Sequence, residues 1–205
     1  VPGLSTAMYE ANKHYTVGLT DTQDATVRLY PAWRAMDNYN VTYDANGGTG
    51  APEAESVRED NSSYTISSAK PTRDNYTFQG WSTTPTATTA AFQPSQSFGK
   101  VTANVTLYAV WKQNPSVTYD ANGGYFTTSM PVDYPSPTGK YKITSIVPVR
   151  EGYEFNGWVG NGAFNGNINI KYNSGSEFKL NNSYDDITLT AQWVKKQYTL
   201  TLDNT

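Results

Sequence analysis

Apolar and polar residues alternate with a period of two along several short segments of the chain. In residues 105–111, Val105, Leu107, Ala109 and Trp111 occupy every second position, so their side chains are expected on one face of a strand, toward a core. The same alternation predicts strands at 41–43, 76–78, 64–66 and 141–143. No segment carries a helical stripe longer than two turns, and the best helix candidate is 54–60. The pattern therefore predicts a mainly β chain.

Three sequence blocks recur in the same order, and the first recurs letter for letter. They are VTYDANGG at 41–48 and 117–124, PxRxxYxFxGW at 71–81 and 148–158, and V/I-T-L-x-A-x-W at 105–111 and 187–193. Eight identical residues in the first block are not chance. A period near 80 residues is too long for a solenoid turn, so the repeats are expected to be small independent domains.

Partial copies at both ends place the domain boundaries. The third block also occurs at 27–33, so residues 1–39 are read as the C-terminal part of a preceding repeat. The complete repeats are predicted at 40–114, here repeat 1, and 115–196, here repeat 2. Residues 197–205 are read as the start of a following repeat. A Gly/Asn-rich insertion in repeat 2 at 161–167 is expected to form an exposed loop.

These three blocks, in this order, resemble the Listeria–Bacteroides repeat, the B-repeat type of internalins and other bacterial surface proteins. The resemblance covers residues 41–112 and 117–194 and the two end fragments. It implies small β-grasp-like units of the α+β class, arranged in tandem as spacers and adhesive modules of secreted or wall-anchored proteins. The family supplies no catalytic motif. We therefore expect an elongated array with weak contacts between repeats.

Composition removes several classes of function. Charged residues make up 16% of the chain, below the roughly 25% typical of soluble domains, and the net charge is -3. A basic surface for nucleic acid or an anionic membrane is therefore not expected, and no apolar run is long enough to cross a bilayer. Any anchoring segment is expected outside this sequence. With no Cys, disulfides and thiolate metal sites are excluded, and the aromatic content of 14% supplies the cores.

Catalytic chemistry finds few candidates. His14 is the only His and lies outside both complete repeats, so a His-based acid, base or metal ligand is not expected in them. The carboxylate pairs Glu59/Asp60 and Asp185/Asp186 are adjacent in sequence and are interpreted as solvated surface. The chain is therefore predicted to be no enzyme, with no catalytic residues, no cofactor and no metal.

The turn segments allow two readings. Asp44 and Asp120 precede Asn-Gly-Gly and superficially resemble a calcium loop, but the later ligands are missing. The favoured interpretation is that each Asp bonds its own backbone and sets up an Asn-Gly turn. A Lys–Asn isopeptide crosslink is a further, less favoured hypothesis. Asn-x-Ser/Thr triplets occur at Asn40, Asn61, Asn75, Asn104 and Asn181 and are given no role in a bacterium.

Two functional hypotheses remain, and the tryptophans separate them. The first is a non-catalytic spacer and interaction module on a bacterial cell surface, with a host protein or glycan as partner. The alternative is a carbohydrate-binding module whose exposed aromatic residues stack on sugars, although binding residues are not assigned. The candidates are Trp33, Trp81, Trp111, Trp158 and Trp193. Because each repeat has few other large apolar residues, Trp81 and Trp158 in particular are expected in the core.

Overall fold

The computed structural model describes residues 33–161 and 170–202. Residues 1–35 and 36–205 form two separate units, and both complete repeats belong to the second. The expectations for His14, for the block at 27–33 and for most of the 161–167 loop lie outside the described residues. Within them every regular element is a strand and there is no helix. The mainly β prediction is confirmed.

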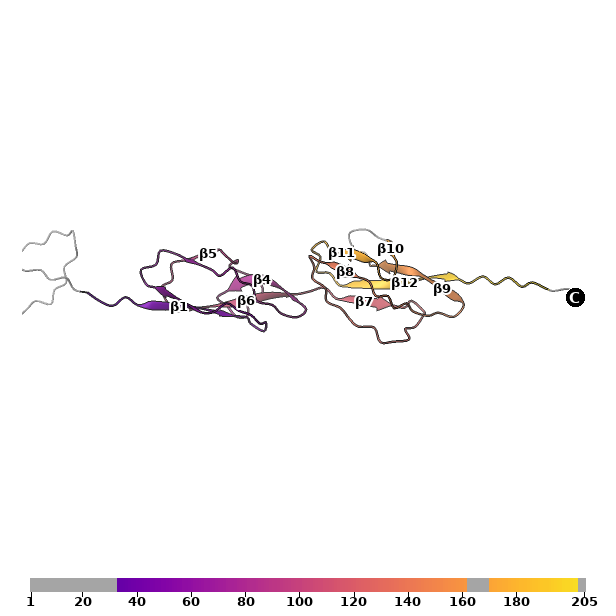
Figure 1. Cartoon of the computed structure of the whole chain (residues 1–205), viewed down its shortest axis with the longest axis horizontal. Coiled ribbons are helices and arrows are strands. Elements are labelled where there is room, and N and C mark those ends of the chain that lie inside the picture. Colours follow the sequence, from indigo (N-terminus) through magenta and orange to yellow (C-terminus); the bar gives the residue numbers. More distant parts are fainter. Residues whose placement is uncertain (1–32, 162–169, 203–205) are drawn as a thin grey trace, which may run out of the picture. The chain divides into compact units, whose positions relative to one another are not determined.

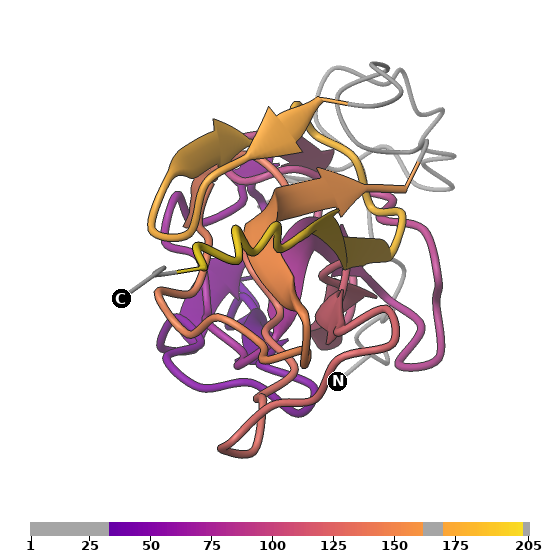
Figure 2. The ribbon, with the colours of Figure 1, turned by 90° about the vertical axis from the view of Figure 1, so that its right-hand side faces the viewer.

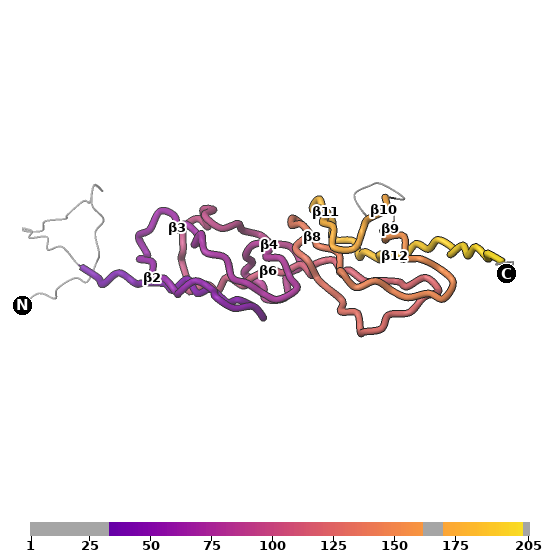
Figure 3. Tube along the Cα trace, turned by 45° about the vertical axis from the view of Figure 1, so that its right-hand side comes forward, coloured from indigo at the N-terminus to yellow at the C-terminus, as the bar shows by residue number. Residues whose placement is uncertain are grey.

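Repeat 1 is built on a four-stranded sheet in the order β2-β1-β6-β4. Figure 1 labels β1, β4 and β6 of this sheet, and Figure 3 labels β2. The first strand of the repeat pairs in parallel with the last, from Val41 with Val105 to Asp44 with Tyr108. Both outer pairings are antiparallel. The strands are β1 (Asn38–Asp44), β2 (Glu55–Arg58), β4 (Tyr76–Ser82) and β6 (Val105–Gln113).

Repeat 2 repeats the central part of this sheet, in the order β10-β9-β12-β7. The parallel pair runs from Val117 with Ile187 to Asp120 with Thr190, and β9 lies antiparallel beside β12 (Figure 2). The place that β2 occupies in repeat 1 is marked here by a single bridge between Val117 and Asp133. The strands are β7 (Val117–Asp120), β9 (Tyr153–Gly160), β10 (Lys171–Tyr172) and β12 (Ile187–Lys195).

Each repeat adds a small two-stranded sheet that brings apolar side chains to the same core. Tyr64 of β3 (Tyr64–Thr65), which pairs with β5 (Ser97–Gly99), belongs to the repeat 1 cluster with Trp81. In repeat 2, β8 (Lys140–Lys142) pairs with β11 (Glu177–Lys179) and places Tyr141 and Phe178 in the cluster with Trp158. Each core is thus enclosed between one larger and one smaller sheet.

All the strands predicted from alternation are present, but the helix candidate is wrong. The segments at 41–43, 76–78, 64–66, 105–111 and 141–143 all lie in or overlap strands. Residues 54–60, the best helix candidate, contain β2 instead. This segment pairs with β1, from Asn38 with Arg58 to Val41 with Glu55, so partners distant in sequence decide its structure.

The strict alternation expected for 105–111 also fails at two residues, Val110 and Trp111. Leu107 and Ala109 are buried as expected, but Val110 is buried too and Trp111 is only partly buried. The reason is a β-bulge in β4: Phe78 pairs with Trp111 and Gly80 with Val110, so Gln79 is the extra residue. Repeat 2 has the same irregularity, between the pairs Ala191–Trp158 and Trp193–Phe155.

The predicted burial of Trp81 and Trp158 is confirmed, because both are 0% exposed. Trp81 packs edge-on against Tyr43 and Phe78, at ring centroid distances of 4.9 and 5.1 Å. Trp158 makes the equivalent contacts with Tyr119 and Phe155. Both tryptophans are therefore core residues and present no ring to a ligand.

Replacing Trp158 with Ala should unfold repeat 2 and leave repeat 1 folded. Truncating a buried aromatic costs about 3–5 kcal/mol, which is comparable to the whole stability of a small domain. Denaturant unfolding followed by NMR measures each repeat separately. Val194→Ala is the control, because Val194 is 50% exposed. Equal unfolding midpoints for Trp158→Ala and the parent would contradict the assigned role.

Candidate functional site

The Asp-Ala-Asn-Gly-Gly segment of repeat 1 forms a tight turn held by its own side chains. Asp44 Oδ1 accepts a hydrogen bond of 2.7 Å from the Asn46 backbone N–H. Asn46 and Gly47 have φ angles of 48° and 89°, which Asn and Gly adopt most readily. In repeat 2, Asp120 accepts from the Asn122 N–H at 2.8 Å. The turn interpretation of Asp44 and Asp120 is confirmed.

The turn is also where the three sequence blocks meet. Asn46 Nδ2 donates to the Ala109 carbonyl at 2.9 Å, and Trp111 Nε1 donates to the Ala45 carbonyl at 2.9 Å. A Cβ at Gly48 would lie 2.5 Å from the Thr72 carbonyl and 2.6 Å from Trp111 Cζ2, so only Gly fits. Trp111, the tryptophan of the third block, therefore stabilises the turn by packing against it. This contact explains why Trp111 is partly buried.

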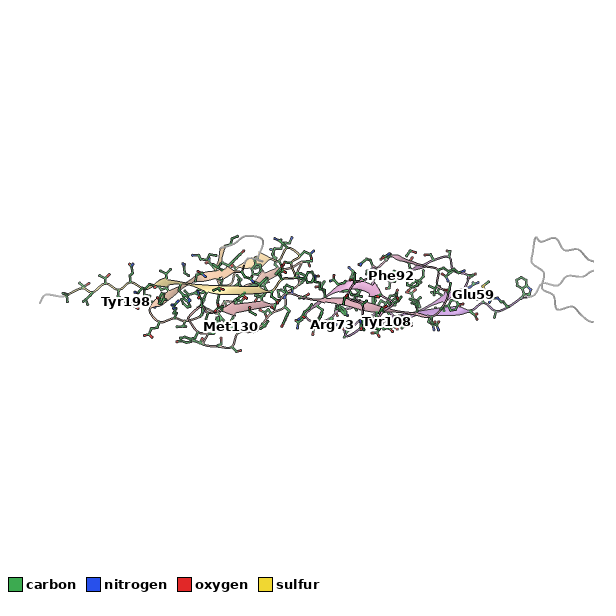
Figure 4. All side chains as sticks on the ribbon, turned by 180° about the vertical axis from the view of Figure 1, so that it is seen from behind. Glu59, Arg73, Phe92, Tyr108, Met130 and Tyr198 are labelled. Atoms are coloured by element: carbon green, nitrogen blue, oxygen red, sulfur yellow. The ribbon has the colours of Figure 1, made fainter. Side chains whose placement is uncertain are left out.

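The Arg-x-x-Tyr part of the second block completes this contact. The Arg73 guanidinium lies 3.9 Å from the Tyr76 ring centroid and borders Gly47 of the turn (Figure 4). Repeat 2 has the same arrangement, with Arg150 lying 4.0 Å from the Tyr153 ring centroid and its Nη1 donating to the Asn122 carbonyl at 3.3 Å. These recurring residues are structural.

A chain of hydrogen-bonded tyrosines recurs in both cores. In repeat 2 the Thr144 N–H donates to the Tyr119 hydroxyl, which lies 3.0 Å from the Tyr141 hydroxyl. Tyr141 in turn donates to Asp133 Oδ2 at 2.6 Å. Burial first, and then the hydrogen bond to Asp133, raises the pKa of Tyr141 above its usual value.

Repeat 1 has the matching pair. The Ser67 N–H donates to the Tyr43 hydroxyl at 2.7 Å, and that hydroxyl lies 2.9 Å from the Tyr64 hydroxyl. Burial, followed by the interactions with Tyr43 and Glu55, raises the pKa of Tyr64. The neutral phenols satisfy buried polar groups, so both chains are interpreted as parts of the core.

Tyr141→Phe should destabilise repeat 2 by about 1–3 kcal/mol, because Asp133 and Tyr119 lose a hydrogen-bond partner. Because the pKa of Tyr141 is raised in the folded state, its contribution to the free energy of unfolding is full below the unfolded pKa of about 10. That contribution is lost as pH rises above this value. The variant should therefore lose stability less steeply above about pH 10. Urea titrations at several pH values measure both effects. Tyr125→Phe is the control, since Tyr125 is 60% exposed, and an unchanged pH slope for Tyr141→Phe would contradict the prediction.

A groove on the surface of repeat 1 begins at the bulge that precedes Trp81. Gly80 has a φ angle of 130°, and a Cβ there would lie 2.5 Å from the Phe92 carbonyl. The bulge directs the Gln79 side chain into a groove of about 650 Å³. That volume lies within the roughly 300–1,000 Å³ typical of ligand sites.

The groove is lined by the partly exposed Trp111, by Ala90 and by polar side chains of which only Lys112 is charged. Gln93 Nε2 donates to the Gln79 carbonyl at 3.0 Å, and Gln79 Nε2 donates to the Thr77 carbonyl and the Tyr184 hydroxyl, at 3.1 Å each. The other polar residues of the lining are Thr88, Thr89, Lys112 and Gln113. The candidate site is therefore formed mainly by carboxamides, hydroxyls and one indole, with one ammonium and one methyl group.

Repeat 2 has a smaller groove beside its own bulge. Asn156, the counterpart of Gln79, and Asn173, the counterpart of Gln93, line a space of about 240 Å³. In repeat 2 the Lys171 stem lies against Gly157, as Ala90 lies against Gly80 in repeat 1. Lys171 Nζ donates a hydrogen bond to Asn156 Oδ1 at 2.9 Å. The larger groove thus lies on repeat 1.

The structure does not bring the proposed acidic pairs to a common site. Asp186 Oδ1 accepts from the Ser116 N–H at 2.7 Å, which lowers the pKa of Asp186, whereas Asp185 bonds Ser183. Asp60 forms an exposed ion pair with Arg58. Among the described residues, no group of three or more His, Asp and Glu side chains is placed to hold a metal ion.

The remaining candidates have separate environments. Trp33 is 90% exposed, but the residues before it lie outside the described ranges. The Asn61 amide bonds both the N–H and the carbonyl of Val101, and Asn104 Oδ1 accepts from the Asn40 N–H. The Lys–Asn contact between Lys171 and Asn156 is a hydrogen bond between exposed side chains. The isopeptide hypothesis stays a prediction.

The fold and the recurring contacts define a class of protein, a tandem array of small all-β repeats. Residues 39–110 and 116–192 each match the family model of the Listeria-Bacteroides repeat domain. These segments make up more than half of the chain, so the chain belongs to this family of bacterial repeat domains. The resemblance seen in the three sequence blocks is confirmed.

Two relatives come from the bacterium Evansella cellulosilytica. One, named "Putative Gly-rich membrane protein", is 26% identical over 179 residues, which cover 86% of this chain and 19% of that protein. The other, named "Putative membrane protein", is 26% identical over 176 residues, which cover 85% of this chain and 24% of that protein. The chain thus spans about a fifth to a quarter of the relatives it matches. No solved structure matches the chain.

The described residues contain no helical segment with the length and hydropathy that a bilayer crossing requires.

Proposed function

We propose that this chain is a non-catalytic repeat region of a bacterial surface protein, acting as a spacer and interaction module that carries tension. The observation that supports this role most directly is the parallel pairing of the first and last main strands in each repeat. The family membership and the names of the two relatives agree with a surface location.

The mechanical argument follows from the direction of these strands. The chain enters repeat 2 at the start of β7 and leaves it at the end of β12, and parallel strands place these two points at opposite ends of the ladder. A force along the chain therefore shears the ladder and loads its hydrogen bonds together. An antiparallel hairpin pulled from its open end would instead break them one by one. A shear geometry suits a stalk.

The connection between the repeats is short and well anchored. Three residues, 114–116, separate the end of β6 from the start of β7. The Asn114 N–H donates to the Asn75 carbonyl at 2.9 Å, its Oδ1 accepts from the Thr77 hydroxyl at 2.6 Å, and Pro115 is fully buried. A connector with little slack transmits force directly between the repeats.

Several finer features belong to the same proposal. The unit is β-grasp-like, supported by the order β2-β1-β6-β4 with parallel central strands, although the described residues contain no helix across that sheet. The array is extracellular, elongated and without enzymatic activity. The domain boundaries near residues 40 and 115 stay predictions.

A crosslink across the parallel ladder tests the tension-bearing role. Thr118 and Thr188 pair in register with their hydroxyl oxygens 3.2 Å apart, so Thr118→Cys with Thr188→Cys places two thiols in contact. Single-molecule pulling through the chain ends should show two unfolding events under reducing conditions. After oxidation the disulfide prevents the segment between these positions from extending. The gain in chain length when repeat 2 unfolds should therefore shrink by a sequence separation of 70 residues, about 240 Å at roughly 3.4 Å per residue.

The matched control changes only the direction of pulling. Handles at Tyr153 and Lys195, which pair at one end of the antiparallel β9–β12 ladder, should open repeat 2 at a clearly lower force than the chain ends do. Equal forces in the two directions would contradict the shear geometry and, with it, the tension-bearing role.

A further inference from the structure

The groove on repeat 1 keeps unused hydrogen-bonding groups on its surface. Among the described residues, the side chains of Thr88, Thr89 and Gln113 make no hydrogen bond, and each is exposed. The Oε1 atoms of Gln79 and Gln93 likewise accept none, because both amides use only their Nε2 atoms. The groove thus offers both donors and acceptors in one depression.

Its apolar contribution comes from Trp111. The indole N–H of Trp111 is already committed to the Ala45 carbonyl, and Phe78 packs edge-on at 5.6 Å. Only carbon atoms of the ring system remain to meet a ligand. An aromatic surface of this kind, beside neutral polar groups, fits a molecule with alternating C–H and O–H groups.

Charge narrows the class of ligand. The lining contains no carboxylate, and its one charged residue is Lys112. The Lys112 ammonium lies 3.8 Å from the ring centroid of Tyr184, a residue outside the lining, and forms a cation–π contact with that ring. A nucleic acid or a sulfated chain would require several cations, so a neutral ligand is favoured.

We propose that the groove of repeat 1 is a binding site for a neutral glycan. Hexose hydroxyls bond the Gln79 and Gln93 carboxamides and the Thr88 and Thr89 hydroxyls, and the C–H face of the sugar packs on Trp111. The glycan is a chain, since the groove is open to solvent and does not enclose a single sugar. This site does not depend on the tension-bearing role, because neither requires the other.

Repeat 2 provides an internal comparison. Its Asn156 Oδ1, the counterpart of the free Gln79 Oε1, is occupied by Lys171 Nζ at 2.9 Å, and its groove is smaller, at about 240 Å³. Repeat 2 therefore does not bind the glycan. The two repeats share the scaffold and differ at the site.

Titration of the whole chain with short soluble fragments of cellulose, mannan and galactan tests the proposal. The chain has five tryptophans, whose indole N–H signals are separately visible by NMR. At least one fragment should shift the Trp111 signal saturably, together with the side-chain amides of Gln93 and Gln113. Heparin should cause no such shift. No saturable shift with any neutral fragment, or a preference for heparin, overturns the proposal.

Two groove variants and one control make the test specific. Ala90→Lys places a Lys stem beside Gly80, as the Lys171 stem lies beside Gly157 in repeat 2, and should weaken binding by at least about tenfold, which is about 1.4 kcal/mol. Thr88→Val combined with Thr89→Val keeps the shape and removes two hydroxyls, so binding should weaken by about tenfold as well. Lys171→Ala changes only repeat 2 and should leave the affinity of repeat 1 unchanged. The indole signals of Trp81 and Trp158 report whether each variant is folded.

Unchanged affinity in either groove variant, with both repeats folded, overturns the proposal. So does an equal loss of affinity in Lys171→Ala, since the site would then not lie in repeat 1.

Discussion

The parallel ladder between the first and last main strands of each repeat is the constraint on which the rest of the fold depends. Val41 pairs with Val105 and Val117 with Ile187. In each repeat, the segment between the two paired strands must therefore return to the strand from which it started. The ladder needs a fixed register, because a shift by one residue would reverse the inward and outward side chains. The Asn46 amide bound to the Ala109 carbonyl, and the Trp111 indole bound to the turn, hold that register.

One β-bulge explains two features that look unrelated. The extra residue at Gln79 turns the chain so that Trp81, two positions later, enters the core at 0% exposure. The same turn directs Gln79 to the surface, where the groove begins. Gly80 allows the backbone to approach the Phe92 carbonyl closely, so the Gly-Trp pair is required for core packing, whereas the side chain of the residue before it takes no part in the core.

The sequence predicted the elements whose cause is local. Alternation found β1 and β6, the Asp-Ala-Asn-Gly-Gly pattern found the turns, and recurrence found the buried Trp81 and Trp158. It failed for β2, because four residues of an edge strand carry too little periodicity and gain their structure from pairing with β1. It also missed the groove. A signal was present, since the bulged position carries a carboxamide in both copies, Gln79 and Asn156, but its direction depends on a bulge that periodicity does not reveal.

The differences between the repeats lie away from the contacts that define them. Trp158 Nε1 donates to the Ser174 hydroxyl at 3.2 Å, whereas Pro94 stands at that position in repeat 1 and the buried Trp81 Nε1 has no partner in the described structure. Both tryptophans are nevertheless fully buried, so the core tolerates one unpaired indole N–H in exchange for a different loop. Because the turn, the ladder and the bulge are kept while the loop residues around Lys171 change, each repeat presents its own surface on the same scaffold.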